Sequence, residues 1–364
     1  MIPLMKILIT NDQKEAVLRV LNSGRYILGE ENRKLEEKFA EYCGAKYSVA
    51  LNSGTAALHL ALITLGIGKG DEIITVPNTF IATSNVALFV GAKPVFVDIN
   101  SETYTMDVES IEKSITPKTK AIIPVHLYGH PADMDPIVKI AEKHGLHVIE
   151  DACQAHGALY KGKKVGSIGD IGCFSFYPSK NMTVCGDGGM LVTNDMEIAE
   201  KARIIRNQGQ KVKNVHESLG YNMRLSEIHA AIARVQLRYL NKWNEARRRN
   251  ASIYDLLFKG LGDKIVRPVE KNWAKHVYHF YVIRASNRDS LRKYLAEREI
   301  ETGIHYPTPV HLQPLYRKLF SFSENMYPVA EKAAKQILSL PCHPALSHVD
   351  IEYIVENIFA FFGG

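Results

Sequence analysis

Between about residues 45 and 195, the sequence alternates short β-type runs with longer runs of helical periodicity. The β-type runs are "YSVAL", "DEIITVP", "KPVFVDI", "KAIIPVHLYG", "LHVIEDA", "GCFSFYP" and "GMLVTN". The helical runs are "TAALHLALITLGI", "TSNVALFVG", "DVESIEKSI" and "DMDPIVKIAEKHG". This alternation predicts an α/β fold whose mostly parallel sheet is covered by helices on both faces. Such sheets bind ligands beyond the carboxyl ends of their strands, so we expect the ligand site among the loops at that edge.

The pattern changes after the charged stretch 241–258, which is typical of a long helix. A strand-like run, "HVYHFYVIRA", then precedes two helical runs, "RDSLRKYLAERE" and "DIEYIVENIFAFFGG". We therefore expect a large domain over residues 1–245 and a smaller C-terminal α+β domain over residues 246–364. No linker rich in Gly, Pro or Ser separates the two parts, so we expect them to pack closely.

Composition excludes several other classes of protein. The 45 basic and 39 acidic residues are spread along the chain, without the basic stripe or aromatic platforms that nucleic-acid binding needs. The five cysteines never form a CxxC spacing and the histidines form no zinc motif, so we expect no disulfide framework and no metal. The chain has neither a leader-like N-terminus nor a long uninterrupted apolar run, which predicts a cytoplasmic protein without a membrane partner.

Two loops of the predicted sheet carry groups suited to an anionic or cationic ligand. Ser53, Gly54 and Thr55 form a tight turn into a helix, whose free N–H groups could seat a phosphate or could simply belong to an ordinary helix cap. Glu150 and Asp151 end the run "LHVIE" and are expected to face the ligand side of the sheet. Such a carboxylate could cap the next turn or pair with a protonated ring nitrogen.

Lys180 follows the apolar run "FSFYPS" and precedes a cluster of glycines. A lysine at a strand end usually extends into water, and its ammonium is not a nucleophile until it loses a proton. An aldehyde cofactor overcomes that limit by forming an imine with the amine. A phosphate seat, an acid for a ring nitrogen and a lysine are together what pyridoxal 5'-phosphate requires.

The order and the amino-acid sequences of these motifs resemble those of the DegT/DnrJ/EryC1/StrS family of sugar-nucleotide aminotransferases over nearly the whole chain. The motifs that carry the resemblance are "LNSGTAALHLAL", "DEIITVPNTFIAT", "GAKPVFVDI", "PVHLYGHPADMDPI", "VIEDACQAHGA", "GDIGCFSFYPSKN", "GDGGM", "GYNMRLSEIHAA" and "HYPTPVHLQP". The resemblance implies the pyridoxal-phosphate-dependent transferase fold of type I, also called the aspartate-aminotransferase fold. It also implies a homodimer with shared active sites, because the family completes each site from a neighbouring subunit.

The resemblance also assigns roles to individual residues. Lys180 becomes the imine lysine and general base, and Asp151 becomes the partner of the pyridine nitrogen. The remaining cofactor contacts are implied for Gly54, Thr55, Phe80, Gln154, Ser175 and, from a neighbouring subunit, Asn222. Substrate contacts are expected from Tyr177, His305 and Tyr306, and more weakly from Tyr26 and Arg224.

The wording of "GDIGCFSFYPSKN" and "HYPTPVHLQP" is most similar to members that aminate C3 of a dTDP-linked 3-keto-6-deoxyhexose with L-glutamate as donor. Members that act at C4 of UDP-, dTDP- or GDP-linked 4-keto sugars share nearly all of these motifs and remain the alternative. Met182 and Cys185 in "NMTVCGDGGM" depart from the family's pattern, and this departure bears on the choice of substrate. Sugar dehydratases of this fold have histidine where Lys180 stands, and a non-catalytic sensor would not need the complete set of Lys180, Asp151 and Ser175.

Overall fold

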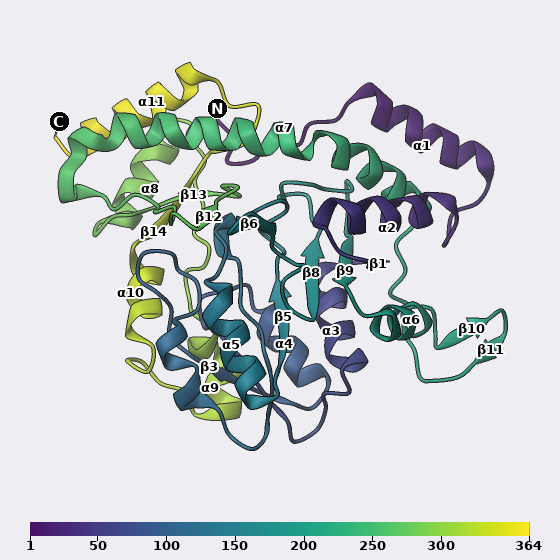
Figure 1. The fold of residues 1–364 in the computed structure, drawn as a ribbon. Helices are drawn as coiled ribbons and strands as arrows, with labels where there is room; N and C mark the ends of the chain where they lie inside the picture. The colour runs from purple at the N-terminus through teal and green to yellow at the C-terminus, as the bar shows by residue number, and fades with distance from the viewer. Residues whose placement is uncertain (364) are drawn as a thin grey trace.

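A computed structural model describes residues 1–363 of the chain. Its central sheet has seven strands in the order β1-β9-β8-β5-β4-β2-β3 (Figure 1). The strands are β1 (Tyr47–Leu51), β9 (Gly189–Thr193), β8 (Ile171–Ser175), β5 (His147–Asp151), β4 (Thr119–Ile122), β2 (Glu72–Thr75) and β3 (Lys93–Phe96). The pairs from β8 to β3 are all parallel, and only β9 runs antiparallel to its neighbours β1 and β8. The predicted mostly parallel sheet is confirmed.

Helices cover both faces of this sheet. One face carries α3 (Gly54–Thr64), α4 (Ala82–Phe89) and α6 (Met196–Ile205). The other carries α2 (Glu30–Cys43), α5 (Met134–His144) and the first half of α7 (Glu227–Leu257). Strand residues such as Ile149 and Val148 are buried on opposite faces, which explains why "LHVIE" shows no alternation of apolar and polar residues.

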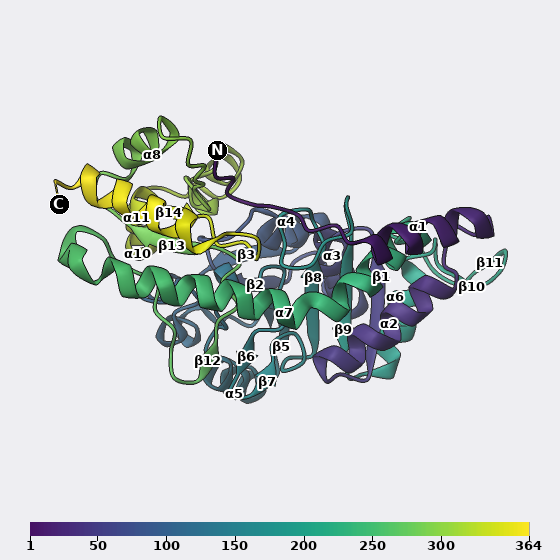
Figure 2. The same cartoon turned by 90° about the horizontal axis from the view of Figure 1, so that it is seen from above.

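Helix α7 continues from the large domain into the C-terminal part of the chain (Figure 2). There its last turns share a separate apolar core with β13 (Tyr281–Arg284), β14 (Ile337–Leu340), α8 (Arg288–Ala296) and α11 (His348–Phe361). These elements have the α+β content expected for the C-terminal part of the chain. The boundary proposed at residue 245 falls inside α7, so that division of the chain stays a prediction.

The remaining elements decorate this framework. Helix α1 (Asn11–Ser23) packs on α7. The hairpin of β10 (Gln210–Val212) and β11 (Val215–His216) projects beyond α6 in Figure 1. The other strands and α-helices are β6 (Leu159–Tyr160), β7 (Lys163–Lys164), β12 (Ala274–Lys275), α9 (Pro314–Phe320) and α10 (Pro328–Gln336).

Two predicted elements were wrong. The helix expected from "DVESIEKSI" is two 3₁₀ turns, at Val108–Ser110 and Glu112–Ser114. Asp107 accepts hydrogen bonds from the backbone N–H of Glu109 and the hydroxyl of Ser110, which favours a local turn over a longer helix. The strand-like run "HVYHFYVIRA" forms a strand only at Tyr281–Arg284, because its earlier N–H groups bind the carbonyls of residues 128 and 129 instead.

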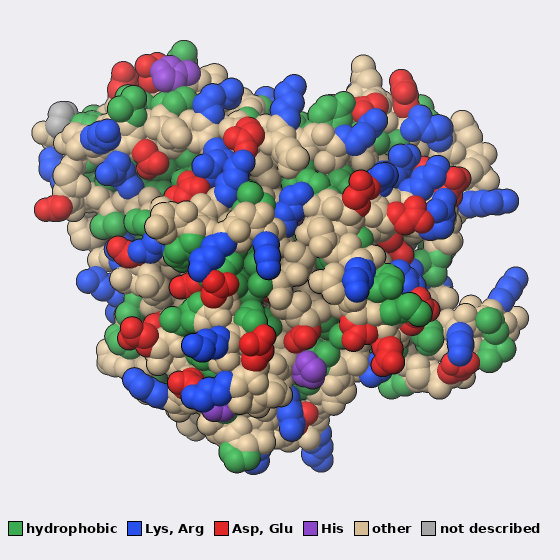
Figure 3. Space-filling model, viewed as in Figure 1, with side chains coloured by type: hydrophobic (Ala, Val, Ile, Leu, Met, Phe, Trp, Pro, Cys, Tyr) green, Lys and Arg blue, Asp and Glu red, His purple; other side chains and the backbone are tan. Residues whose placement is uncertain are grey.

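The surface matches the dispersed charge of the sequence. Lys and Arg side chains are interspersed with Asp and Glu over the face shown in Figure 3. No helix in residues 1–363 is both long and apolar enough to cross a membrane. Within the same residues, no three His, Cys, Asp or Glu side chains converge in a way that could hold a metal ion.

Candidate active site

A cavity of about 440 Å³ opens where β5 and β8 end, at the carboxyl edge of the parallel strands. Most of the predicted site residues line it together: Gly54, Thr55, Phe80, Asp151, Gln154, Ser175, Tyr177, Lys180, His305 and Tyr306. The first eight come from the large domain. His305 and Tyr306 come from the chain between α8 and β14, so both parts of the protein contribute to one cavity.

The turn at Ser53–Thr55 is the start of α3 and forms one wall of the cavity. Ser53 is the cap, because its Oγ accepts the N–H of Ala56 at 3.0 Å. Within residues 1–363, the N–H groups of Gly54 and Thr55 have no acceptor. A Cβ on Gly54 would lie 2.7 Å from Cβ of Ser175, so only glycine lets the turn approach β8 this closely. The result is a helix N-terminus with two free donors facing a cavity.

Asp151 and Glu150 end β5 but lie on opposite faces of the sheet. The Asp151 carboxylate lines the cavity, where Oδ2 accepts the hydroxyl of Thr83 at 2.8 Å and Oδ1 accepts the N–H of Cys153 at 3.1 Å. Glu150 is fully buried beside His126 and accepts the N–H groups of residues 166, 168 and 169. The expectation that both acids face the ligand side was wrong for Glu150, because successive strand residues point to opposite faces.

The loop between β8 and β9 presents Lys180 to the cavity, and helix α7 holds this loop in place. The backbone N–H of Lys180 donates to the carbonyl of Tyr177 at 2.9 Å, which forms a tight turn. The next residue, Asn181, donates to Oδ1 of Asn244 at 2.9 Å, and Thr183 donates its N–H to Oε1 of Gln236 at 2.8 Å. Lys180 therefore sits on a short loop that is anchored to α7 on one side.

The surroundings of Lys180 make its ammonium easier to deprotonate. Its Nζ makes no hydrogen bond or ion pair within residues 1–363, and burial lowers the pKa of the ammonium against the opposing effect of Cys153 and Asp151. Burial, and then the charge of Lys180, lowers the pKa of His305 to about 4, so His305 is neutral at physiological pH. A lysine with a lowered pKa in a cavity suits a nucleophile or a general base.

Aromatic and amide groups also line the cavity. Phe80 is 54% exposed, so its ring is available to a ligand and is not part of the core. It lies 5.9 Å from the ring of Tyr306, measured between centroids. The Gln154 amide donates to the Tyr306 hydroxyl at 3.1 Å, while its Oε1 accepts the N–H of Tyr128 at 2.9 Å. This hydrogen bond fixes the side chains of Gln154 and Tyr306 relative to each other.

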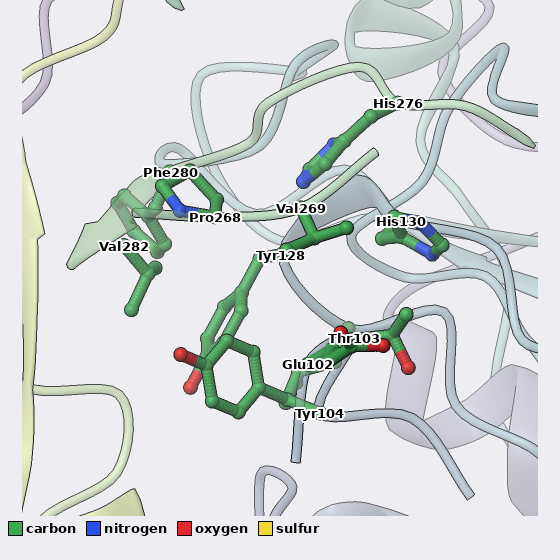
Figure 4. A pocket seen from close by; sticks show the side chains of 11 residues that line it. Glu102, Thr103, Tyr104, Tyr128, His130, Pro268, Val269, His276, Phe280 and Val282 are labelled. Carbon is green, nitrogen blue, oxygen red and sulfur yellow. The ribbon is translucent and has the colours of Figure 1, made fainter. Parts of the chain in front are cut away.

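A second, much smaller cavity of about 10 Å³ has Tyr104 and Tyr128 in its lining (Figure 4), and their rings meet edge to face with 5.7 Å between the centroids. The hydroxyl of Tyr128 donates to the carbonyl of His305. The ring of His305 stacks on Phe280 at 4.1 Å and its Nδ1 lies 2.9 Å from Oγ of Ser339. Packing behind the cavity therefore fixes His305, and the small space itself has room for little more than a water molecule.

Three predicted residues lie outside the cavity of a single chain. Tyr26 is exposed, and its hydroxyl donates to the carbonyl of Leu21. Arg224 donates to Oδ1 of Asn222 at 3.1 Å and to Oδ1 of Asn207 at 3.2 Å. The segment 222–224 runs beside residues 51–52, directly before the Ser53 cap, with Asn222 exposed and Arg224 half-buried.

The cavity is also lined by residues that the sequence did not predict: Leu58, Thr79, Ala82, Thr83, Val125, Cys153, Ser179 and Asp187. Thr83 is the most informative of these, because it binds Asp151 directly. Thr79 and Thr83 are four residues apart in "NTFIAT", a spacing that puts two side chains on one helical face. That spacing in the sequence could have indicated that the two threonines act together, but it does not reveal that their partner is Asp151 on β5.

The sheet, the lysine on its anchored loop and the acid that lines the same cavity are typical of fold type I pyridoxal-phosphate-dependent transferases. Within that class, the model of the DegT/DnrJ/EryC1/StrS aminotransferase family matches residues 8–359. The chain belongs to this family.

Similar proteins cover nearly the whole chain. A "Pleiotropic regulatory protein" of Geobacillus stearothermophilus is 48% identical over 96% of this chain and 95% of its own length. The dTDP-3-amino-3,4,6-trideoxy-alpha-D-glucose transaminase of Streptomyces venezuelae is 45% identical over 94% of this chain and 90% of its own. The crystal structure of S. venezuelae DesV superimposes with a TM-score of 0.93, at 44% identity, over 96% of this chain and 94% of that one.

Proposed function

We propose that this aminotransferase binds pyridoxal 5'-phosphate and moves the amino group of L-glutamate to a nucleotide-linked keto-sugar, with dTDP-3-keto-6-deoxyhexose as the preferred acceptor. The observation that carries the proposal is the convergence of Lys180, Asp151 and the free N–H groups of Gly54 and Thr55 on one cavity. The choice of acceptor rests on the resemblance in the sequence and on the activity named for the S. venezuelae relative.

We also propose that the protein acts in the cytoplasm, in keeping with its five free cysteines. Cell fractionation tests this location.

The residues of the cavity fit the cofactor in three places. The start of α3 offers two N–H donors and the positive end of a helix to a phosphate. Asp151 offers a carboxylate already oriented by two hydrogen bonds, as a protonated ring nitrogen requires. Lys180 offers an amine whose pKa is lowered, and Phe80 offers an exposed aromatic face.

Each group has a distinct task in amino transfer. When bound, the cofactor supplies an aldehyde that exchanges with the substrate amine and a ring that accepts electrons from the substrate carbon. Lys180 Nζ removes and returns the proton on the carbon that carries the amino group. Asp151 holds a proton on the ring nitrogen, and Phe80 limits the tilt of the ring. Tyr177, His305 and Tyr306 line the cavity where the sugar would bind, with His305 neutral and able to accept a hydrogen bond.

The test is transfer of a ¹⁵N label from L-glutamate to a panel of nucleotide sugars, followed by mass spectrometry. The panel contains a dTDP-linked 3-keto-6-deoxyhexose and the 4-keto-6-deoxyhexoses of UDP, dTDP and GDP. Label in the 3-keto sugar is the expected result. Label only in a 4-keto sugar would move the proposal to C4, and no label in any sugar, with cofactor bound, would overturn the proposed function.

We further propose that the protein is a homodimer whose subunits complete each other's sites. Lys180 is the only cationic side chain among the described residues that line the cavity, while both glutamate and a nucleotide diphosphate are anions. Asn222 and Arg224 lie exposed or half-buried outside the cavity of their own chain, so a second copy can bring them to it.

Mixed dimers test this arrangement. A subunit with Lys180→Ala, paired with one carrying Asn222→Ala, has one intact site if the sites are shared. Its activity should then be about half that of the wild-type dimer, well above either variant alone. Activity of the mixed dimer no higher than the mean of the two variants would show that each site is built by one chain.

A further inference from the structure

Thr83 is buried in the first turn of α4 and reaches the acid at the end of β5. Its side chain is 2% exposed and lines the cavity, and its Oγ lies 2.8 Å from Oδ2 of Asp151. The other carboxylate oxygen accepts the N–H of Cys153 at 3.1 Å. The carboxylate is thus held at both oxygens, by donors from two different segments of the chain.

The hydroxyl proton of Thr83 has one best acceptor. Its Oγ has three oxygen neighbours: Oδ2 of Asp151 at 2.8 Å, Oγ of Thr79 at 2.8 Å and the carbonyl of Phe80 at 3.0 Å. An ionised carboxylate only accepts hydrogen bonds, and bonds to it are stronger than those to neutral oxygens. Thr83 therefore donates to Asp151, and Thr79 can donate to Thr83.

The same turn also carries the aromatic wall of the cavity. The backbone N–H of Thr83 donates to the carbonyl of Phe80 at 3.1 Å, and Thr79, Phe80 and Thr83 all line the cavity. One turn of chain consequently sets both the position of the aromatic ring and the orientation of the acid. A flat heteroaromatic ligand needs these two features in a fixed relation, because one contacts its face and the other its edge.

We propose that Thr83 is a positioning residue that aims the Asp151 carboxylate at the ring nitrogen of the cofactor. This inference rests on the proposed function for the identity of the cofactor. It adds a residue that acts through Asp151 and touches no reacting atom. Without the hydroxyl, the carboxylate keeps one of its two donors and can turn away from the ring nitrogen.

The test compares two cofactors in the apoprotein. Pyridoxal 5'-phosphate carries the ring nitrogen, whereas 1-deazapyridoxal 5'-phosphate has a C–H group in its place. Thr83→Val removes the hydroxyl at nearly constant volume, and Thr83→Ser keeps it. Thr75→Val is the matched control, because Thr75 is equally buried but donates to the carbonyl of Ile123 outside the cavity.

With Thr83→Val, we expect the dissociation constant of pyridoxal phosphate to rise about tenfold, as for a lost hydrogen bond to a charged group. In the same variant, the dissociation constant of the deaza analogue should change less than about twofold. Thr83→Ser and Thr75→Val should leave the ratio of the two dissociation constants near that of the wild type. If Thr83→Val does not fold, Thr83→Ala provides the same ratio.

Equal losses for both cofactors would mean that Thr83 is merely structural, and no loss for either would also overturn the inference. Failure of the proposed function gives a different result. Wild-type protein that binds pyridoxal phosphate but transfers no label from glutamate leaves the Thr83 inference standing. Wild-type protein that binds no pyridoxal phosphate overturns both.

Discussion

Replacing Lys180 by alanine is expected to lower the rate of amino transfer by at least about a thousandfold, because the variant loses both the amine nucleophile and the general base. Burial already favours the neutral amine at this position, and no other lysine or arginine in the described residues lines the cavity. Neighbouring groups therefore offer no replacement. The rate of label transfer from glutamate under saturating cofactor measures the effect.

Lys164→Ala is the matched control. Lys164 is also partly buried, with a pKa lowered by burial, but it donates to the carbonyl of Tyr42 and lies outside the cavity. This variant should keep the wild-type rate. Borohydride reduction and peptide mass spectrometry add a second readout, since the cofactor should become fixed to residue 180 in the wild type and in Lys164→Ala only. Full turnover by Lys180→Ala would contradict the assignment.

The sheet and its ligand edge could be predicted because they follow from local patterns. Strands buried on both faces appear as unbroken apolar runs, and the ends of parallel strands collect at one edge. Gly54, Asp151 and Lys180 each follow or end such a run, which is why they were found together. The resemblance to a family then supplied His305 and Tyr306, which no spacing connects to the large domain.

The remaining features depend on how distant segments pack together. Alternation along a strand puts Glu150 and Asp151 on opposite faces of the sheet, but which of the two lines the cavity depends on how β5 is placed in the fold. The bond from Thr83 to Asp151 joins residues 68 positions apart, so no window of local sequence contains it. The positions of Asn222 and Arg224 outside the cavity depend on how the segment 222–224 packs beside residues 51–52, which no local sequence pattern shows.

The small number of cationic groups in the cavity bears on the proposed dimer. In the proposed function, one lysine faces a cavity that must accept two anionic substrates in turn, and that lysine must be neutral when it acts as a base. Arg224, by contrast, forms no ion pair with an acid within residues 1–363. Two asparagine oxygens hold it beside the start of α3. Dimerisation would therefore place a charge where the single chain lacks one, without lowering the reactivity of Lys180.

The second large effect is expected for Asp151→Asn, which should lower the transfer rate by at least about a hundredfold. Asparagine keeps the size of the side chain and can still accept the hydroxyl of Thr83, but it cannot hold a proton on the ring nitrogen as an anion does. Binding of pyridoxal phosphate should weaken as well, whereas the deaza analogue, which has no nitrogen to pair, should bind about equally to both proteins.

Asp170→Asn provides the control for this change. Asp170 accepts the N–H of Val148 at 2.8 Å at the opposite end of β8, away from the cavity, and pairs with His147. Its loss should affect stability and leave the transfer rate unchanged. If Asp151→Asn kept the wild-type rate while Asp170→Asn behaved as expected, Asp151 would have no part in the chemistry, and the orientation supplied by Thr83 would then have no catalytic consequence.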